Sequence, residues 1–240
     1  SKTEDGPVSA TGAFTSAMTG LTPGTMYYVR AYATNAVATV YGEEVTFTAH
    51  QLPVITTQAV TGIATDTATG NGNVTALGVP NPTEHGVVWS TAENPTIDDD
   101  KTTGGSVSTT GAFISEITGL TPGTLYHVRA YATNAAGTVY GDDITFTTYL
   151  EPSVTTQPVT EIATTTATGN GTLTALGIPD PIQHGVVWST NPAPTIDDSK
   201  TTDGPVSATG AFTSAMTDLT PGTLYYVRAY ATNEAGTVYG

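Results

Sequence analysis

The chain of 240 residues carries 21 acidic and 6 basic side chains, which gives a formal net charge of −15 at pH 7. Phosphate backbones and anionic lipid headgroups would repel so acidic a chain, so the composition argues against binding to nucleic acid or to a membrane surface. The absence of Cys excludes disulfides, thiol catalysis and cysteine-based zinc sites. No stretch approaches the roughly 20 apolar residues of a membrane span.

An internal repeat organises the whole chain. The stretches LTPGTMYYVRAYATN, LTPGTLYHVRAYATN and LTPGTLYYVRAYATN begin at residues 21, 120 and 219, a constant spacing of 99 residues. The six basic residues follow the same spacing, with one Lys and one Arg in each unit, as do Trp89 and Trp188. The chain is therefore a tandem array of one unit that recurs without loss of register.

The register of the repeat divides the chain into three parts in order. Residues 1–51 hold the C-terminal half of a β-sandwich repeat without its opening strands, residues 52–150 hold a complete repeat, and residues 151–240 hold a repeat that lacks its last strand. An unpaired sheet edge tends to pair with another chain. We therefore expect either a segment of a longer array or a neighbouring molecule that supplies the missing strand.

Within the complete unit, the local patterns predict about seven short strands and no helix, because β-branched and aromatic residues alternate between frequent turn residues. Six segments carry this signal, the fourth as one or two strands: Val54–Gln58, Thr65–Leu77, His85–Thr91, Ser106–Thr118, Tyr126–Asn134 and Asp143–Thr148. Tyr126–Asn134 alternates strictly, which predicts one buried and one outward face. The whole pattern is typical of a β-sandwich.

At Leu120–Tyr126, the sequence LTPGTLY followed by VRAYATN resembles the second half of a fibronectin type III domain. The resemblance implies a tyrosine corner, in which a Tyr hydroxyl bonds back to the nearby backbone, at Tyr27, Tyr126 and Tyr225. The segments GVVWST, NPTIDD and YVRAYATN are also similar to tandem repeats of bacterial cell-surface and extracellular proteins.

From this resemblance we expect an all-β chain of tandem seven-stranded fibronectin type III-like sandwiches with a 99-residue repeat, arranged as a rod. The Trp position departs from the family. Trp89 falls in the third predicted strand, whereas the type III domain usually carries its Trp in the second. An immunoglobulin-like variant therefore stays open.

The joins between units are short. Only Ala49–Leu52 and Tyr149–Glu151 separate one predicted sandwich from the next, with no Gly/Ser or Pro-rich spacer. Leu52, Tyr149 or Leu150 could wedge between neighbouring domains. Units joined in this way are expected to stack as a semi-rigid rod in which each unit contacts only its neighbours.

An acidic loop is the one candidate metal site. It contains Asp98, Asp99 and Asp100 in the complete unit, and Asp197 and Asp198 in the next. Clustered carboxylates on a loop suit calcium, although the spacing is not that of an EF-hand. The alternative is a solvated loop whose Asp side chains cap turns. No other cofactor is expected.

An aromatic stripe on the outward face of the Tyr strand is a candidate surface for glycan binding or lateral packing. In each unit it flanks the single Arg, and its residues are Tyr28, Arg30, Tyr32, His127, Arg129, Tyr131, Tyr226, Arg228 and Tyr230. Such stripes can stack sugars or pack against a neighbouring rod. The alternative is cross-strand pairing, in which each Tyr shields its own sheet.

No catalytic constellation recurs in the chain, because the four His residues lack partners at metal-ligand or triad spacing. We expect a non-catalytic structural protein at the cell surface: an extracellular stalk, filament or fibre, with a role in adhesion. Its partners would be neighbouring repeats, copies of itself and surface glycans. The alternative function is a carbohydrate-binding accessory module of a secreted polysaccharide-acting enzyme.

Overall fold

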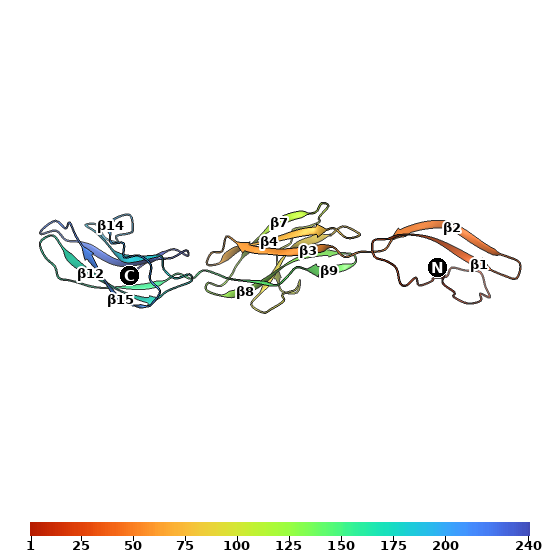
Figure 1. Ribbon diagram of the computed structural model, residues 1–240, viewed down its shortest axis with the longest axis horizontal. Helices are drawn as coiled ribbons and strands as arrows, with labels where there is room; N and C mark the ends of the chain where they lie inside the picture. Colours follow the sequence, from red (N-terminus) through yellow and green to blue (C-terminus); the bar gives the residue numbers. More distant parts are fainter.

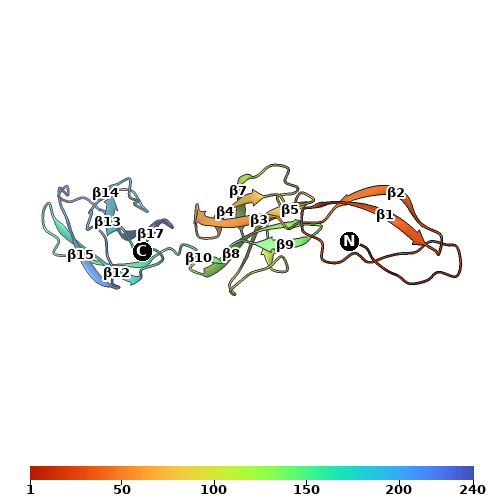
Figure 2. The same cartoon turned by 45° about the vertical axis from the view of Figure 1, so that its right-hand side comes forward.

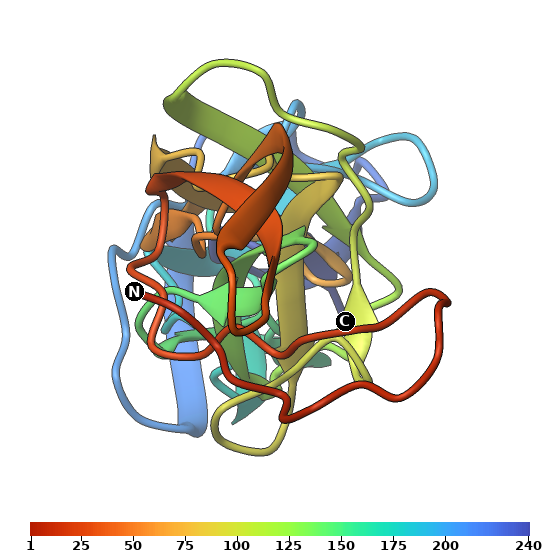
Figure 3. The ribbon, with the colours of Figure 1, turned by 90° about the vertical axis from the view of Figure 1, so that its right-hand side faces the viewer.

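The computed structural model describes residues 1–240 as an all-β chain without a helix. The three parts of the repeat lie one after another along the longest axis (Figures 1 and 2), and they overlap in projection when viewed along that axis (Figure 3). No helix of sufficient length and hydrophobicity to cross a bilayer is present.

The first part contains a single antiparallel hairpin. It consists of β1 (Met26–Thr34) and β2 (Thr39–Thr48), and it pairs Tyr27 with Phe47. No second sheet covers this hairpin, so most of its side chains are exposed.

The complete unit is a sandwich of two antiparallel sheets. One sheet has the order β3 (Val54–Thr61), β4 (Thr67–Ala76) and β7 (Gly111–Thr118). The other sheet has the order β6 (Asp100–Lys101), β5 (Glu84–Ser90), β8 (Leu125–Asn134) and β10 (Ile144–Thr147), with β9 (Gly137–Tyr140) also paired to β8. The first, second and fifth strands thus face the third, fourth, sixth and last strands. This arrangement confirms the predicted fibronectin type III-like sandwich.

The third part repeats both sheets. Its first sheet has the order β11 (Ser153–Thr160), β12 (Ala167–Ala175) and β15 (Gly210–Met216). Its second sheet has the order β14 (Ser199–Lys200), β13 (Gln183–Ser189), β16 (Tyr226–Thr232) and β17 (Thr237–Tyr239). No strand of residues 1–240 occupies the place that β10 takes in the complete unit.

Most predicted strands appear with shifted ends, and two features differ from the sequence prediction. Only the second part of the fourth predicted strand, Ser106–Thr118, forms a strand, which is β7 and begins at Gly111. The short β6 lies before this predicted range and was not predicted. The prediction also lacked β9, so that the last strand of the sheet is interrupted: β9 and β10 both pair with β8, on either side of Gly141. Trp89 does lie in the third strand, β5.

The interruption in the last strand lets the two sheets bond to each other. At this gap the N–H of Ala130 in β8 donates to the hydroxyl of Thr57 in β3, at 3.0 Å. A Cβ on Gly141 would collide with the backbone of Thr57, so only glycine permits this approach. In the third unit, the N–H of Ala229 donates to Thr156 in the same way, at 2.9 Å.

The core combines large side chains with glycines on the facing strand. Val87, Trp89, Tyr126 and Phe146 belong to one buried cluster. Gly72 in β4 leaves room for a second cluster that contains Val74 and Ala130, because a Cβ at Gly72 would overlap the ring of Phe113 and approach the Cβ of Ala130 to 2.8 Å.

We predict that Gly72→Ala lowers the free energy of unfolding by about 1–3 kcal/mol, the usual cost of overpacking a core. Urea unfolding followed by tryptophan fluorescence measures the change. Gly12→Ala is the control, because no atom lies within 4 Å of the added methyl there. An unchanged midpoint for Gly72→Ala would contradict the close packing.

Candidate functional site: the junctions between units

The chain passes from the second unit to the third between two consecutive residues. The N–H of Tyr149 donates to the carbonyl of Ala64 at 2.9 Å, and its carbonyl accepts from the N–H of Gly123 at 3.2 Å. Leu150 instead exchanges two hydrogen bonds with Ile178 of the third unit, each 2.8 Å long. Tyr149 is therefore bonded to the second unit and Leu150 to the third, with no unbonded residue between them.

A buried asparagine holds this junction from the side of the third unit. Asn233 is 4% exposed, and its Nδ2 donates to the carbonyls of Leu150 and Pro179, both at 2.8 Å. Its Oδ1 accepts from the N–H of Ala235 at 2.9 Å. Burial of an amide costs little when its donors and acceptor are satisfied in this way. Asn233 thus fixes the path of the incoming chain.

The junction between the first part and the second unit repeats the asparagine contact, but His50 lies between its two bonded residues without a backbone hydrogen bond. Ala49 exchanges backbone hydrogen bonds with the first part, and Gln51 exchanges two with Val79 of the second unit. Asn134 Nδ2 donates to the carbonyls of Gln51 and Pro80, at 2.7 and 2.8 Å. The repeat therefore carries the asparagine contact from one junction to the next.

Side chains also reach across the second junction in both directions. Leu150 lies against Gly123 of the second unit, where a Cβ would come within 3.2 Å of Leu150 Cδ2. The carboxylate of Glu234, in the third unit, raises the pKa of the Tyr149 hydroxyl. Leu52, at the first junction, lies beside Gly137.

The tyrosine-corner residues bond to the turn that carries the junction. The hydroxyl of Tyr126 accepts from the N–H of Thr121 at 3.0 Å, and its ring stacks on Phe146 with centroids 5.7 Å apart. The same bond joins Tyr27 to Thr22 and Tyr225 to Thr220. Each bond ties the strand that contains the Tyr to the turn before it. In the second unit this turn contains Gly123, whose N–H donates to the carbonyl of Tyr149.

Each arginine of the aromatic stripe contacts a tyrosine of its own sheet. The guanidinium carbons of Arg30, Arg129 and Arg228 lie 5.1, 4.6 and 4.6 Å from the ring centroids of Tyr41, Tyr140 and Tyr239. Their Nε atoms donate to the backbone carbonyls of Gly42, Gly141 and Gly240. These contacts favour the cross-strand interpretation of the stripe.

The expectation that Tyr131 and Tyr230 lie on an exposed face is wrong. Both rings are buried, because the loops that follow β6 and β14 cover them. Their hydroxyls donate to the carbonyls of Thr102 and Thr201, at 2.7 and 2.6 Å. Tyr32 is tied down in a similar way, since its hydroxyl donates to the carbonyl of Thr3 at 2.7 Å.

Of the aromatic residues in the stripe, Tyr28 and Tyr226 remain open to solvent, at 66% and 40% exposure. They occupy the same position in different units, and the complete unit has His127 there. A continuous exposed ladder is therefore not formed.

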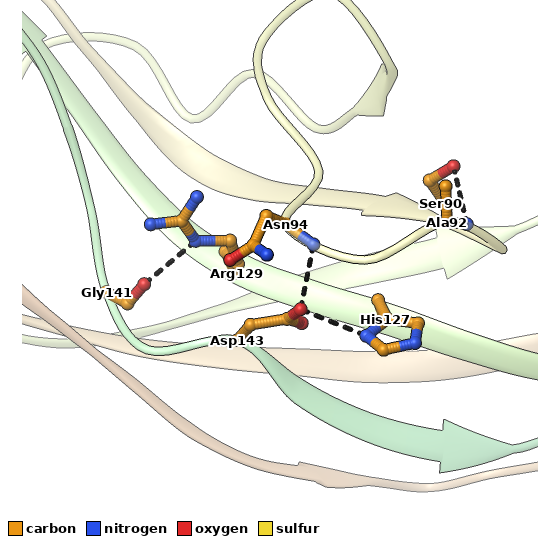
Figure 4. A network of polar contacts seen from close by, with 7 residues as sticks. All are labelled: Ser90, Ala92, Asn94, His127, Arg129, Gly141 and Asp143. Atoms are coloured by element: carbon orange, nitrogen blue, oxygen red, sulfur yellow. Dashed lines mark hydrogen bonds and ion pairs between the residues drawn. The ribbon is translucent and has the colours of Figure 1, made fainter.

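His127 forms a polar cluster that the third unit lacks (Figure 4). Its Nδ1 lies 3.0 Å from Asp143 Oδ2, which also accepts from the N–H of Asn94 at 2.8 Å. The second oxygen, Asp143 Oδ1, is buried without a hydrogen-bond partner. The cluster joins β8, the start of β10 and the loop that follows β5.

The acidic loop is held by hydrogen bonds within the protein. Asp99 Oδ2 accepts from the N–H of Thr96 at 2.9 Å, and the hydroxyl of Tyr140 accepts from the N–H of Ile97 at 3.0 Å. The third unit repeats both contacts, from Thr195 to Asp198 and from Ile196 to Tyr239. No group of three or more His, Asp or Glu side chains in residues 1–240 lies together as metal ligands would. Calcium binding by Asp98, Asp99, Asp100, Asp197 and Asp198 stays a prediction.

The asparagine at the junction was not identified from the sequence, although a signal was present. Asn35, Asn134 and Asn233 end the YATN motif of every unit. An amide at the end of an otherwise apolar strand is a candidate for a structural hydrogen bond. The partners of that bond lie 83 residues away, at Gln51 for Asn134 and at Leu150 for Asn233, so only the fold reveals them.

The fold and the junctions together define a class of protein: a tandem array of fibronectin type III-like β-sandwiches. The sequence matches no known protein-family profile and no curated protein sequence.

Solved structures of tandem fibronectin type III domains are similar to the chain. The FN1–FN3 domains of chicken CNTN1 share 14% identity at a TM-score of 0.40, over 92% of this chain and 75% of that one. A two-domain fibronectin type III segment of chicken tenascin shares 14% identity at a TM-score of 0.32, over 80% of this chain and 97% of that one. The fold assignment itself rests on the strand order of the two sheets.

We predict that Asn233→Ala loosens the junction, because the carbonyl of Pro179 loses its amide donor and that of Leu150 loses one of two. Loss of such bonds costs about 1–3 kcal/mol, so the amide protons of Leu150 and Ile178 should exchange roughly 10 to 100 times faster in NMR hydrogen exchange. Asn35→Ala is the matched control, because the amide oxygen of Asn35 bonds only within its own hairpin turn. Unchanged exchange at Leu150 would contradict the role of Asn233.

The buried tyrosines predict a loss of stability at alkaline pH. Burial raises the pKa of Tyr131 and of Tyr230, and the bond from Tyr131 to Glu84 raises the former further. In the unfolded chain these hydroxyls ionise near pH 10. The stability that they contribute is therefore complete below about pH 10 and is lost as the pH rises above it.

The free energy of unfolding should fall between about pH 10 and pH 12, and the slope should be smaller in the Tyr131→Phe, Tyr230→Phe double variant. Tyr226→Phe serves as the control, because that ring is exposed and its hydroxyl has no bond in the structure. An identical slope in the double variant would show that the buried hydroxyls do not cause the loss.

Proposed function

We propose that this chain is part of a non-catalytic structural protein outside the cell, a stalk or filament in which stacked β-sandwiches set length and stiffness. The observation that carries the proposal is the transfer of the chain from one unit to the next between the consecutive residues Tyr149 and Leu150. A linker without a free residue restricts the rotation of one unit against another. At the first junction Gln51 is held in the same way by Val79 and Asn134, and one residue, His50, separates it from the last bonded residue of the first part.

The class of fold supports this function at a coarse level, because fibronectin type III-like domains are structural and adhesion-type modules in general. The finer assignment to a bacterial cell surface, with a role in adhesion, follows from the resemblance of the repeat to such proteins. Its partners would be neighbouring repeats, further copies of the chain and surface glycans. The strongly acidic surface keeps like molecules apart except at specific contacts.

Two of the four histidines, His85 and His184, make structural contacts within their own units. Nδ1 of His85 lies 2.9 Å from the carbonyl of Gly105, and the ring meets Phe113 edge-on. His184 repeats both contacts with Gly204 and Phe212. These positions support a structural role for the two residues.

A carbohydrate-binding accessory module is the second candidate. The observation in its favour is the exposure of Tyr28 and Tyr226, whose rings could each stack on a sugar. Glycan-array screening of the chain against the Tyr28→Ala, Tyr226→Ala double variant tests it. Glycan binding that the double variant loses would replace the structural proposal with this one.

Small-angle X-ray scattering tests the stalk directly. Strands of nine or ten residues rise about 3.3 Å per residue, so each unit is roughly 30–35 Å long and the chain should extend to about 100 Å. We expect a rod-like pair-distance distribution with that maximum dimension. A compact particle half as long would contradict the proposal.

Calcium removal tests the acidic loop. If Asp98–Asp100 and Asp197–Asp198 bind calcium, EGTA should lower the melting temperature and 1 mM CaCl₂ should restore it, because a ligand that binds only the folded state stabilises it. The Asp100→Asn, Asp197→Asn variant should lose this response; both carboxylates accept no hydrogen bond in the structure. A melting temperature that does not respond to EGTA would leave the loop as a solvated turn.

A further inference from the structure

The hydroxyl of Tyr131 has two acceptors for a single proton. Oε1 of Glu84 lies 2.6 Å from it, and the carbonyl oxygen of Thr102 lies 2.7 Å from it. A phenol has one O–H donor, although its oxygen can also accept a hydrogen bond. Both contacts are therefore satisfied together only when Glu84 is a protonated carboxylic acid, which donates to Tyr131 while Tyr131 donates to Thr102. An ionised Glu84 instead competes with Thr102 for the proton of the tyrosine.

The third unit places a neutral donor at the same position. Gln183 lies 99 residues after Glu84, and its Nε2 donates to the hydroxyl of Tyr230 at 3.3 Å. That hydroxyl donates in turn to the carbonyl of Thr201 at 2.6 Å. Because the amide of Gln183 does not ionise, both hydrogen bonds of the third unit are made in acid and at neutral pH alike.

The bond from Tyr131 to Thr102 holds the loop between β6 and β7 on the sheet. Thr102 is the first residue of this loop. Further along, the N–H groups of Gly104 and Val107 donate to backbone carbonyls in and just before β5, at 2.7 and 3.0 Å. The bond from tyrosine to loop recurs in all three parts of the chain. The acidic side chain beside it in the complete unit is thus a departure from the third unit at a shared structural contact.

The groups that face Glu84 from the neighbouring strands leave its charge without a basic partner. Tyr131 of β8 is its hydrogen-bond partner, and Tyr140 of β9 pairs with Tyr131. Arg129 lies two residues before Tyr131 on β8, but its guanidinium lies over the ring of Tyr140 and its Nε donates to a backbone carbonyl. No basic side chain forms an ion pair with Glu84. Glu84 is partly exposed, so a proton from solvent can neutralise it.

The remaining elements around Glu84 present no further charge to it. Lys101 of β6 donates to the carbonyl of Ile97, and the ring of His85 meets Phe113 edge-on. The loop between β6 and β7 contains no ionisable side chain. In the third unit the equivalent loop contains Asp203, whose carboxylate accepts from Ser214, and Tyr239 pairs with Tyr230. Comparison within the complete unit is therefore the cleaner test.

We propose that Glu84 makes the complete unit sensitive to acid. Glutamate side chains ionise near pH 4.3 in unfolded chains. Below about pH 4 the protonated carboxyl donates to Tyr131, which then holds the loop through Thr102. At higher pH the carboxylate takes the proton of Tyr131, so the loop between β6 and β7 loosens. The third unit keeps its loop closed throughout, so units of one array differ in their response. This switch goes beyond the proposed structural function and does not depend on it.

NMR hydrogen exchange of the 240-residue chain tests the switch. Protection factors correct for the effect of pH on intrinsic exchange and report the opening of the loop. Those of Gly104 and Val107 should fall roughly three- to tenfold between pH 3.5 and pH 7, the equivalent of one hydrogen bond. That of Val206, at the equivalent position of the third unit, should not fall. General acid destabilisation would change protection in the opposite direction.

Isosteric variants exchange the behaviour of the two units. Glu84→Gln should keep Val107 protected at both pH values, and Gln183→Glu should give Val206 the pH dependence. Glu116→Gln is the matched control, because this exposed carboxylate of the same unit lies on β7 and should leave the pH dependence unchanged. Constant protection of Val107 in the unaltered chain, or a pH dependence that survives Glu84→Gln, would overturn the proposal. Either result leaves the length measured by X-ray scattering, and with it the stalk, untouched.

Discussion

The arrangement of the molecule depends on the carbonyl of one residue at each junction. Leu150 O accepts from the N–H of Ile178 and from the amide of Asn233, immediately after Tyr149 has bonded to the preceding sandwich. Because Tyr149 is held by the second unit and Leu150 by the third, only the backbone torsions between these two residues can change the angle between the units. The tyrosine corners and the glycines of the preceding turn serve to present Tyr149 in the right place.

The repeat turns this local constraint into a property of the whole chain. Each unit contacts only its neighbours, so the stability of the array is close to a sum of unit and junction contributions. In the function that we propose, length, stiffness and repetition are the properties that matter. The repeat is also broken at single positions: His127 and Asp143 join the last strand of the complete unit to β8, whereas the first part has Tyr28 and Glu44 at these positions.

The class of fold could be predicted from the sequence because alternation and turn residues are local signals. The tyrosine corner followed from a short motif in the same way. The burial of Tyr131 could not be predicted, because the loop that covers it is distant in sequence and leaves no periodic pattern. The interruption at Gly141 and the hydrogen bonds of the junction asparagines could not be predicted for a similar reason. Their partners, Thr57 and Gln51, lie 73 or more residues away along the chain.

The central claim, that consecutive residues hold neighbouring units at a fixed angle, is tested most directly by a distance between units. Because the chain has no Cys, Ile114→Cys and Thr213→Cys place two spin labels at equivalent exposed positions of the second and third units. Double electron–electron resonance should give one narrow distance distribution. A broad or multimodal distribution would show that the units rotate freely and would contradict the account.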